Sequence, residues 1–149
     1  MSSATTPRSR SRGDGALTAS NDRAAARELA FTAARAADAK GGRDIVVLEV
    51  GDVLVVADEF VIVSAPNDRL VRAIVEEIER VVGERGLGKP LRIEGLDALR
   101  WVLMDYGDVI VHVFLDETRA YYELERLWSD VPVLDWAEAD ATASPRAAP

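Results

Sequence analysis

Apolar residues recur at intervals of three and four positions between residues 67 and 83, in the stretch N-D-R-L-V-R-A-I-V-E-E-I-E-R-V-V-G. This spacing places them on one face of a helix and leaves the charged residues on the other. Asn67 is well suited to cap the first turn. The apolar stripe consists of Val71, Ile74, Val75, Ile78, Val81 and Val82.

Two further helices are predicted on either side of this one. The first begins at Ser20 or Asn21, which can cap it, is rich in alanine and ends at Gly41-Gly42. The last runs from residue 116 to 128. In that helix Tyr121, Leu124 and Trp128 form a stripe that we expect to face the core.

Runs of β-branched and aromatic residues predict about five strands, at 44–50, 59–65, 91–94, 100–105 and 108–115. The last two strands are joined by a tight connection at Tyr106-Gly107. Strands and helices therefore alternate irregularly along the chain. This order predicts the α/β class, with a mixed sheet on which helices pack.

The stretch D-Y-G-D-V-I-V-H-V-F, residues 105–114, contains the single histidine of the chain. Alternation along a strand places Val109, Val111 and Val113 on one face and Ile110, His112 and Phe114 on the other. Both faces are apolar, as expected for a central strand that is covered on both sides. We interpret His112 as a buried residue bonded to a carbonyl or carboxylate group, with a role in recognition as the alternative.

Composition divides the chain into a body and two ends. Residues 1–20 and 137–149 are rich in small and polar residues and are expected to be disordered tails. Residues 21–136 are expected to form a single domain. The two ends carry charges of +2 and −1, which leaves −9 for the body out of a total of −8. Such a body disfavours direct nucleic-acid binding and favours a basic partner.

Several kinds of chemistry have little support in the sequence. The chain has no cysteine and one histidine, so we expect no disulfide, no metal site and no cofactor. The segment G-E-R-G-L-G-K-P, 83–90, resembles a phosphate-binding loop, but proline replaces the required hydroxyl and the segment follows a helix. We interpret it as a helix end and a turn. There is no G-x-S-x-G motif for a serine nucleophile.

Location is predicted from the same residues. No apolar run approaches the ~20 residues that span a bilayer. The arginine-bearing start is not followed by the apolar segment of a secretory signal. We therefore expect a protein of the cytoplasm that does not enter the membrane.

The segment E-G-x(5)-W-x-L-x-D-Y-G-D-V-I-V-H-V-F, followed by R-x-Y-Y-x-L-E-x-L-W, closely resembles the ribosomal silencing factor family, also called Iojap-like proteins. The resemblance extends back through A-D-E-F-V-I-V-S-A-P-N-D-R and covers roughly residues 22–132. The chain departs from the family at Ala57 to Phe60, where a Thr-Asp-aromatic stretch is common. It departs again at Ser64 to Pro66, where Ser-Gly is common.

The resemblance implies a fold similar to nucleotidyltransferases but without their catalytic carboxylates, and the chain has no Asp-x-Asp pair. It also implies a non-enzymatic role: binding to the fourteenth protein of the large ribosomal subunit, steric blocking of subunit joining and repression of translation. Trp101 is the expected apolar anchor, and Asp105 and Asp108 are expected to meet basic side chains. The further candidates for partner binding are Tyr106, His112, Tyr122 and Glu125.

Two alternatives remain open at this stage. One is a metal-dependent, nucleotidyltransferase-like enzyme that uses Asp105 or Asp108, although the turn chemistry of aspartate also accounts for these residues. The other is a self-associating scaffold, since strand pairing or an apolar face could produce a homodimer.

Overall fold

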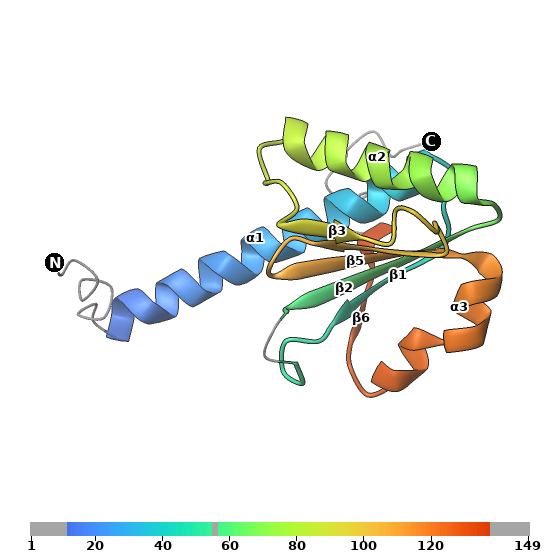
Figure 1. The fold of residues 1–149 in the computed structure, drawn as a ribbon. Coiled ribbons are helices and arrows are strands. Elements are labelled where there is room, and N and C mark those ends of the chain that lie inside the picture. Colours follow the sequence, from blue (N-terminus) through green and yellow to red (C-terminus); the bar gives the residue numbers. More distant parts are fainter. Residues whose placement is uncertain (1–11, 55–56, 138–149) are drawn as a thin grey trace, which may run out of the picture.

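The fold is built on one six-stranded sheet (Figure 1). The computed structural model describes residues 12–54 and 57–137, with side chains for 22–54, 57–124, 126 and 128–137. The strands, in chain order, are β1 (Arg43–Glu49), β2 (Glu59–Ala65), β3 (Arg92–Glu94), β4 (Trp101–Asp105), β5 (Val109–Leu115) and β6 (Val133–Leu134).

The strand order across the sheet is β3-β4-β5-β2-β1-β6. β2 and β5 are parallel and pair Phe60 with Ile110, whereas all other neighbouring strands are antiparallel. The predicted mixed sheet of the α/β class is therefore confirmed. The predicted count of about five strands was too low, because β6 has two residues and is too short to produce a recognisable pattern.

One face of the sheet is covered by the two long helices, α1 (Arg12–Ala39) and α2 (Asp68–Glu84) (Figure 1). The capping role predicted for Asn67 is confirmed, since its side-chain oxygen accepts a hydrogen bond of 2.8 Å from the Leu70 amide. Most of the predicted apolar stripe of α2 is fully buried, and Val81 is half-buried. Buried alanines of α1 provide a smooth surface on which the sheet and α2 pack: Ala30, Ala33, Ala34 and Ala37.

The first helix begins at Arg12, so the predicted N-cap at Ser20 or Asn21 is wrong. The residues around this point tolerate a helical conformation, and a capping residue alone does not prevent a helix from continuing through it. The first turns of α1 extend beyond the sheet (Figure 1). They overlap residues 12–20 of the predicted N-terminal tail, while the division into one domain with two tails otherwise stays a prediction.

Among the described residues, shorter elements pack on the opposite face of the sheet. α3 (Asp116–Tyr122) follows β5 directly, and a short 3-10 helix, η2 (Leu124–Trp128), comes after it. The single helix predicted over 116–128 is interrupted at Glu123, whose φ of 47° is left-handed. No glycine marks this break in the sequence. As a result, Leu124 and Trp128 pack against the core as predicted, but Tyr121 is 81% exposed and its predicted core position is wrong.

The alternation predicted for β5 is confirmed, because the strand separates two layers of core. Val109, Val111 and Val113 pack on the helix side. On the other side, Phe114 is buried in a smaller cluster with Phe60 and Ile62. His112 shares this second side and is 4% exposed. Since β5 lies between β4 and β2, its position in the centre of the sheet is also confirmed.

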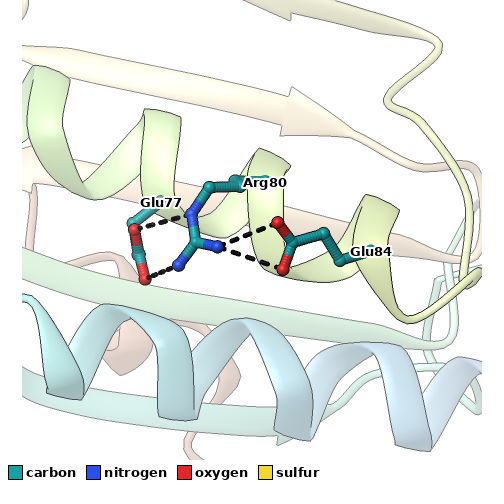
Figure 2. Close-up of polar contacts among 3 residues, drawn as sticks. All are labelled: Glu77, Arg80 and Glu84. Atoms are coloured by element: carbon teal, nitrogen blue, oxygen red, sulfur yellow. Dashed lines mark hydrogen bonds and ion pairs between the residues drawn. The ribbon is translucent and has the colours of Figure 1, made fainter.

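The outer surface of α2 carries a charge network. Figure 2 shows the Arg80 guanidinium group between the Glu77 and Glu84 carboxylates, with donor–acceptor distances of 2.7–3.3 Å. The hydrogen bond with Arg80 lowers the pKa of Glu77. These pairs at three- and four-residue spacing support the helix on its solvent side, and the buried valine and isoleucine side chains hold it on the sheet.

Candidate functional site: an aromatic and acidic sheet face

Trp101 is the first residue of β4 and lies on the sheet face opposite α1 and α2. Its ring contacts Phe114 on the neighbouring strand and Tyr122 of α3, with centroid separations of 4.8 and 5.0 Å. The side chain is half-buried, so part of the indole remains available at the surface. A tryptophan fixed in this manner is typical of an anchor in a protein interface.

His112 fixes the orientation of the Trp101 indole through a hydrogen bond. The Trp101 Nε1–H group donates a hydrogen bond of 3.1 Å to His112 Nδ1. The rings of Phe60 and His112 pack edge to face, with a centroid separation of 4.7 Å. Burial lowers the pKa of His112 to about 4, so the ring is neutral near pH 7. Because Nδ1 accepts a hydrogen bond, the proton of the neutral ring lies on Nε2. No described group bonds to that Nε2.

These contacts settle where His112 lies. It is a buried residue, as interpreted from the alternation, but its partner is an indole N–H group rather than the expected carbonyl or carboxylate. It contributes to the surface by fixing the orientation of Trp101 and is itself too deeply buried to contact a partner directly.

Two hollows flank Trp101. One, of about 410 Å³, lies toward α3 and is lined by Arg100, Trp101, Glu117, Thr118, Tyr121 and Tyr122. The other, of about 380 Å³, lies toward β3 and is lined by Glu94, Gly95, Trp101 and Leu103. We call this surface, with Trp101 between its two hollows, the Trp101 face. It combines apolar rings with carboxylates and so fits an apolar, basic surface of a partner.

Tyr122 and Tyr121 form the outer edge of the Trp101 face. Tyr122 is 50% exposed, and its ring meets that of Tyr121 at a centroid distance of 4.9 Å, nearly perpendicular. Sequence reasoning selected Tyr122 but missed Tyr121, because an uninterrupted helix would have turned Tyr121 inward. The left-handed Glu123 changes where the residues after Tyr122 point, and it has no signature in the sequence.

Asp105 lies on the same side of β4 as Trp101 but at the other end of the strand. Its Oδ1 accepts a 2.8 Å hydrogen bond from the Gly107 amide, and its Oδ2 is 3.4 Å from Arg92 Nε. The turn role considered for this residue is therefore confirmed. Its carboxylate is already paired within the chain, so a partner would have to compete with Arg92 for it.

Asp108 and Tyr106 lie away from Trp101. Asp108 is exposed in the turn before β5, and partial burial, Asp58 and Asp22 raise the pKa of its carboxyl group. Tyr106 packs on the helix side of the sheet, where burial raises the pKa of its hydroxyl to about 12. The side chain of Glu125 lies outside the described residues. Of the predicted residues whose side chains are described, only Trp101 and Tyr122 share one exposed surface, whereas Asp105, Tyr106 and Asp108 lie at the other end of β4.

The structure also places the two sequence features that suggested other chemistry. Residues 83–90 form the end of α2 and the turn that follows, with the Gly86 amide donating to the Gly83 carbonyl, as interpreted. Among the residues whose side chains are described, no group of three or more histidine and acidic side chains is arranged to hold a metal ion. No helix within the described ranges is long and apolar enough to cross a membrane.

Comparison with known proteins agrees with this architecture. Residues 23–149 match the family model described as "Ribosomal silencing factor during starvation". The chain is similar to the ribosomal silencing factor RsfS of Bacillus subtilis, with 45% identity over 103 residues, which cover 69% of this chain and 86% of that one. The chain therefore belongs to the ribosomal silencing factor family.

A crystal structure and a more distant relative extend the comparison. The crystal structure, of a Chromobacterium violaceum protein, has a TM-score of 0.67 and 30% identity, covering 70% of this chain and 86% of that one. A mouse protein named "Mitochondrial assembly of ribosomal large subunit protein 1" is 36% identical over 92 residues, 60% of this chain and 40% of the mouse protein.

Proposed function

We propose that this protein binds a basic protein of the large ribosomal subunit through the Trp101 face, and that the bound chain blocks joining of the small subunit and so represses translation. The observation that carries the proposal is the partly exposed indole of Trp101, which is held by His112 and flanked by two hollows. Interface energy is typically concentrated in such packed aromatic residues.

Family and charge support the choice of partner. The family model is named for silencing of ribosomes, and the mouse relative is named for the large subunit. The family resemblance implies the fourteenth protein of that subunit. Ribosomal proteins are generally basic, and the net charge of −8 on this chain would favour the encounter. Such a partner places the proposed action in the cytoplasm.

The proposed mechanism is steric and requires no turnover. A domain of this size that occupies a contact point between the subunits would prevent their approach. We therefore propose a binding protein rather than an enzyme, one that needs no cofactor. Whether the chain also forms a homodimer stays a prediction, which its molecular mass at several concentrations would test.

The decisive experiment is co-sedimentation with purified large subunits, with and without small subunits. Wild type should sediment with large subunits and lower the yield of joined particles. Trp101→Glu should weaken binding by about 30-fold or more, the equivalent of about 2 kcal/mol. Val133→Glu is a matched control, because Val133 is 67% exposed on β6, at the opposite edge of the sheet from β3 and β4.

A second variant guards against simple unfolding of the first. Tyr121→Glu changes a ring that is 81% exposed, so it should leave the fold intact and still weaken binding. Wild-type affinity in both Trp101→Glu and Tyr121→Glu would exclude the Trp101 face. Binding that leaves subunit joining unchanged would exclude the steric mechanism but not the binding site.

A further inference from the structure

A carboxylate that was not among the predicted site residues lies beside Trp101. The two aspartates expected to meet a basic partner are not placed to do so there, because Asp105 is bound by its own turn and by Arg92, and Asp108 lies at the other end of β4. Glu94, on the edge strand β3, instead lines the hollow of about 380 Å³ on that side of the indole. We call this cavity the β3 hollow.

The register between β3 and β4 places Glu94 near the indole. Glu94 pairs with Leu103, which lies two positions after Trp101 and therefore on the same face of β4. The next pair on this face is Arg92 with Asp105. The β3 hollow thus has an aromatic wall from Trp101, an aliphatic wall from Leu103 and a carboxylate from Glu94.

Charge distinguishes the β3 hollow from the hollow on the other side of Trp101. Among the described residues that line the β3 hollow, Glu94 is the only one with an ionisable side chain. The hollow toward α3 is lined by both Arg100 and Glu117. A cationic side chain would meet a like charge there, whereas the β3 hollow offers it a negative charge alone.

The lining of the β3 hollow matches each part of an arginine side chain. The aliphatic stem would lie along Leu103. The guanidinium group would stack on the Trp101 indole and donate two parallel hydrogen bonds to the Glu94 carboxylate. Arginine fits better than lysine, because its planar group can stack on an indole and pair with a carboxylate at the same time.

Glu94 already has a neighbour within the chain, and this neighbour has a second acceptor. Arg92 Nε lies 3.3 Å from Glu94 Oε2 and 3.4 Å from Asp105 Oδ2. The Arg92 and Glu94 side chains are 63% and 59% exposed, so solvent weakens their attraction. Asp105 is only 18% exposed. A guanidinium group from a partner would therefore replace Arg92 at Glu94 while Arg92 keeps its contact with Asp105.

We propose that the β3 hollow binds one arginine side chain of the ribosomal partner, with its guanidinium group stacked on Trp101 and hydrogen-bonded to Glu94. This inference rests on the proposed function and names the chemical group of the partner that the Trp101 face recognises. Arg92 competes with that arginine for Glu94. In the free protein Arg92 contacts both carboxylates, and in the complex it contacts Asp105 alone.

The first test measures the affinity of variants for purified large subunits by co-sedimentation. Glu94→Gln should weaken binding by about five-fold and Glu94→Lys by about 30-fold or more, because the first removes the charge and the second reverses it. Glu76→Lys is the matched control. Glu76 is exposed on α2, on the other face of the sheet, and its substitution changes the net charge equally. It should change the affinity by less than about three-fold.

The outcomes separate this inference from the proposed function. Absence of wild-type binding would overturn both. Wild-type affinity in Glu94→Lys, together with loss of binding in Trp101→Glu, would overturn the inference alone, as would equal losses in Glu94→Lys and Glu76→Lys. Because Glu94 is exposed, its variants should keep the Tm of the wild type to within about 2 °C, which excludes unfolding as the cause of a loss.

Arg92→Gln distinguishes recognition by Glu94 from a structural role. Removing the competing guanidinium group should raise the affinity for large subunits by about two-fold or more, although the substitution removes ion pairs within the chain. If Glu94 acted only by holding Arg92 and β3 in place, Arg92→Gln would weaken binding as Glu94→Gln does. An affinity at or below that of the wild type would refute the competition.

Competition by small cations tests which side chain the β3 hollow takes. Methylguanidinium chloride at about 50 mM should lower the wild-type affinity more than methylammonium chloride at the same concentration, which provides the same ionic strength. This difference should disappear in Glu94→Gln. Equal inhibition of the wild type by the two salts would exclude arginine as the bound side chain.

Discussion

At the scale of single residues, the pair formed by Trp101 and His112 connects the core to the proposed interface. The imidazole accepts the indole N–H hydrogen bond and lies almost entirely out of solvent. The orientation of Trp101, the proposed recognition side chain, is therefore set by a residue that is too deeply buried to contact a partner.

We predict that His112→Phe weakens large-subunit binding although the variant folds. Phenylalanine keeps an apolar ring in the cluster but removes the acceptor, leaving the indole N–H unpaired at a cost of about 1–2 kcal/mol. His112→Gln retains an acceptor and should lose less affinity. Equal affinities for wild type and His112→Phe, measured by titration with large subunits, would contradict the positioning role.

A second buried ionisable residue, Glu59, gives the free energy of unfolding a pH dependence opposite to that given by His112. Burial raises the pKa of Glu59 from 4.5 to about 7, against the opposing effect of Arg27, whose Nε is 3.3 Å from Oε2. The stabilising contribution of Glu59 is present below pH 4.5 and is lost as pH rises through 7. Burial lowers the pKa of His112 from 6.5 to about 4, so its contribution is present above pH 6.5 and is lost as pH falls through 4.

We therefore predict that the free energy of unfolding of the wild type changes little between pH 4.5 and 6.5, where the two slopes oppose each other. Glu59→Gln should become more stable as pH rises across this window, and His112→Phe less stable. Each slope should approach about 1.4 kcal/mol per pH unit at most. Urea unfolding at three pH values measures these slopes. If the free energy of unfolding depended on pH in the same way in wild type, Glu59→Gln and His112→Phe, the opposing contributions of Glu59 and His112 would be excluded.

At the scale of elements, the turn between β3 and β4 positions Trp101. Gly95 has a φ of 94°, and a Cβ atom at this position would collide with the Trp101 carbonyl oxygen. A side chain here is thus excluded both by backbone conformation and by the close approach of the next strand.

We predict that Gly95→Ala destabilises the fold by about 2 kcal/mol or more and displaces the start of β4. Gly86→Ala is the matched control. Gly86 also has a positive φ, 72°, but a Cβ atom there would meet nothing within 4 Å. It should cost only the left-handed penalty of about 1 kcal/mol. Equal losses in chemical denaturation would show that the contact with Trp101 is unimportant.

The elements also show how far the sequence was informative. Periodicity correctly predicted α2, its Asn67 cap and the two-sided β5, because burial in these elements repeats with the period of the structure. The missed features depend on tertiary contacts or on single dihedral angles. β6 is a strand only because its two residues pair with β1. The helix breaks at Glu123, a residue with a positive φ that is not a glycine and so could not be recognised in the sequence.

The candidate site was predicted only in part for a similar reason. Trp101 and Tyr122 do share a surface, but Tyr106 points toward the helices and Asp105 is bound by its own turn and Arg92. Adjacent positions in a strand face opposite sides, and the sequence does not show which acidic side chains find partners within the chain.

At the scale of the whole molecule, the net charge of −8 should act mainly on the rate of encounter with a basic partner. We predict that raising ionic strength from about 0.05 to 0.5 M slows association with large subunits by about ten-fold and changes dissociation much less. Stopped-flow association rates measure this effect. Glu117→Lys, at the edge of the Trp101 face, should reduce both the rate and its salt dependence, and a salt-independent rate would exclude steering by charge.

The parallel pairing of β2 with β5 has a consequence for how the protein is made. Phe60 cannot pair with Ile110 until α2, β3 and β4, which lie between β2 and β5 in the sequence, have been synthesised. During synthesis, β2 therefore emerges without the neighbour that will cover it, and contacts this distant in sequence form slowly. A nascent chain halted before residue 109 would lack the strand that carries His112 and supports Trp101. The surface proposed to act on ribosomes would thus be completed only after β5 and α3, which span residues 109–122, have been synthesised.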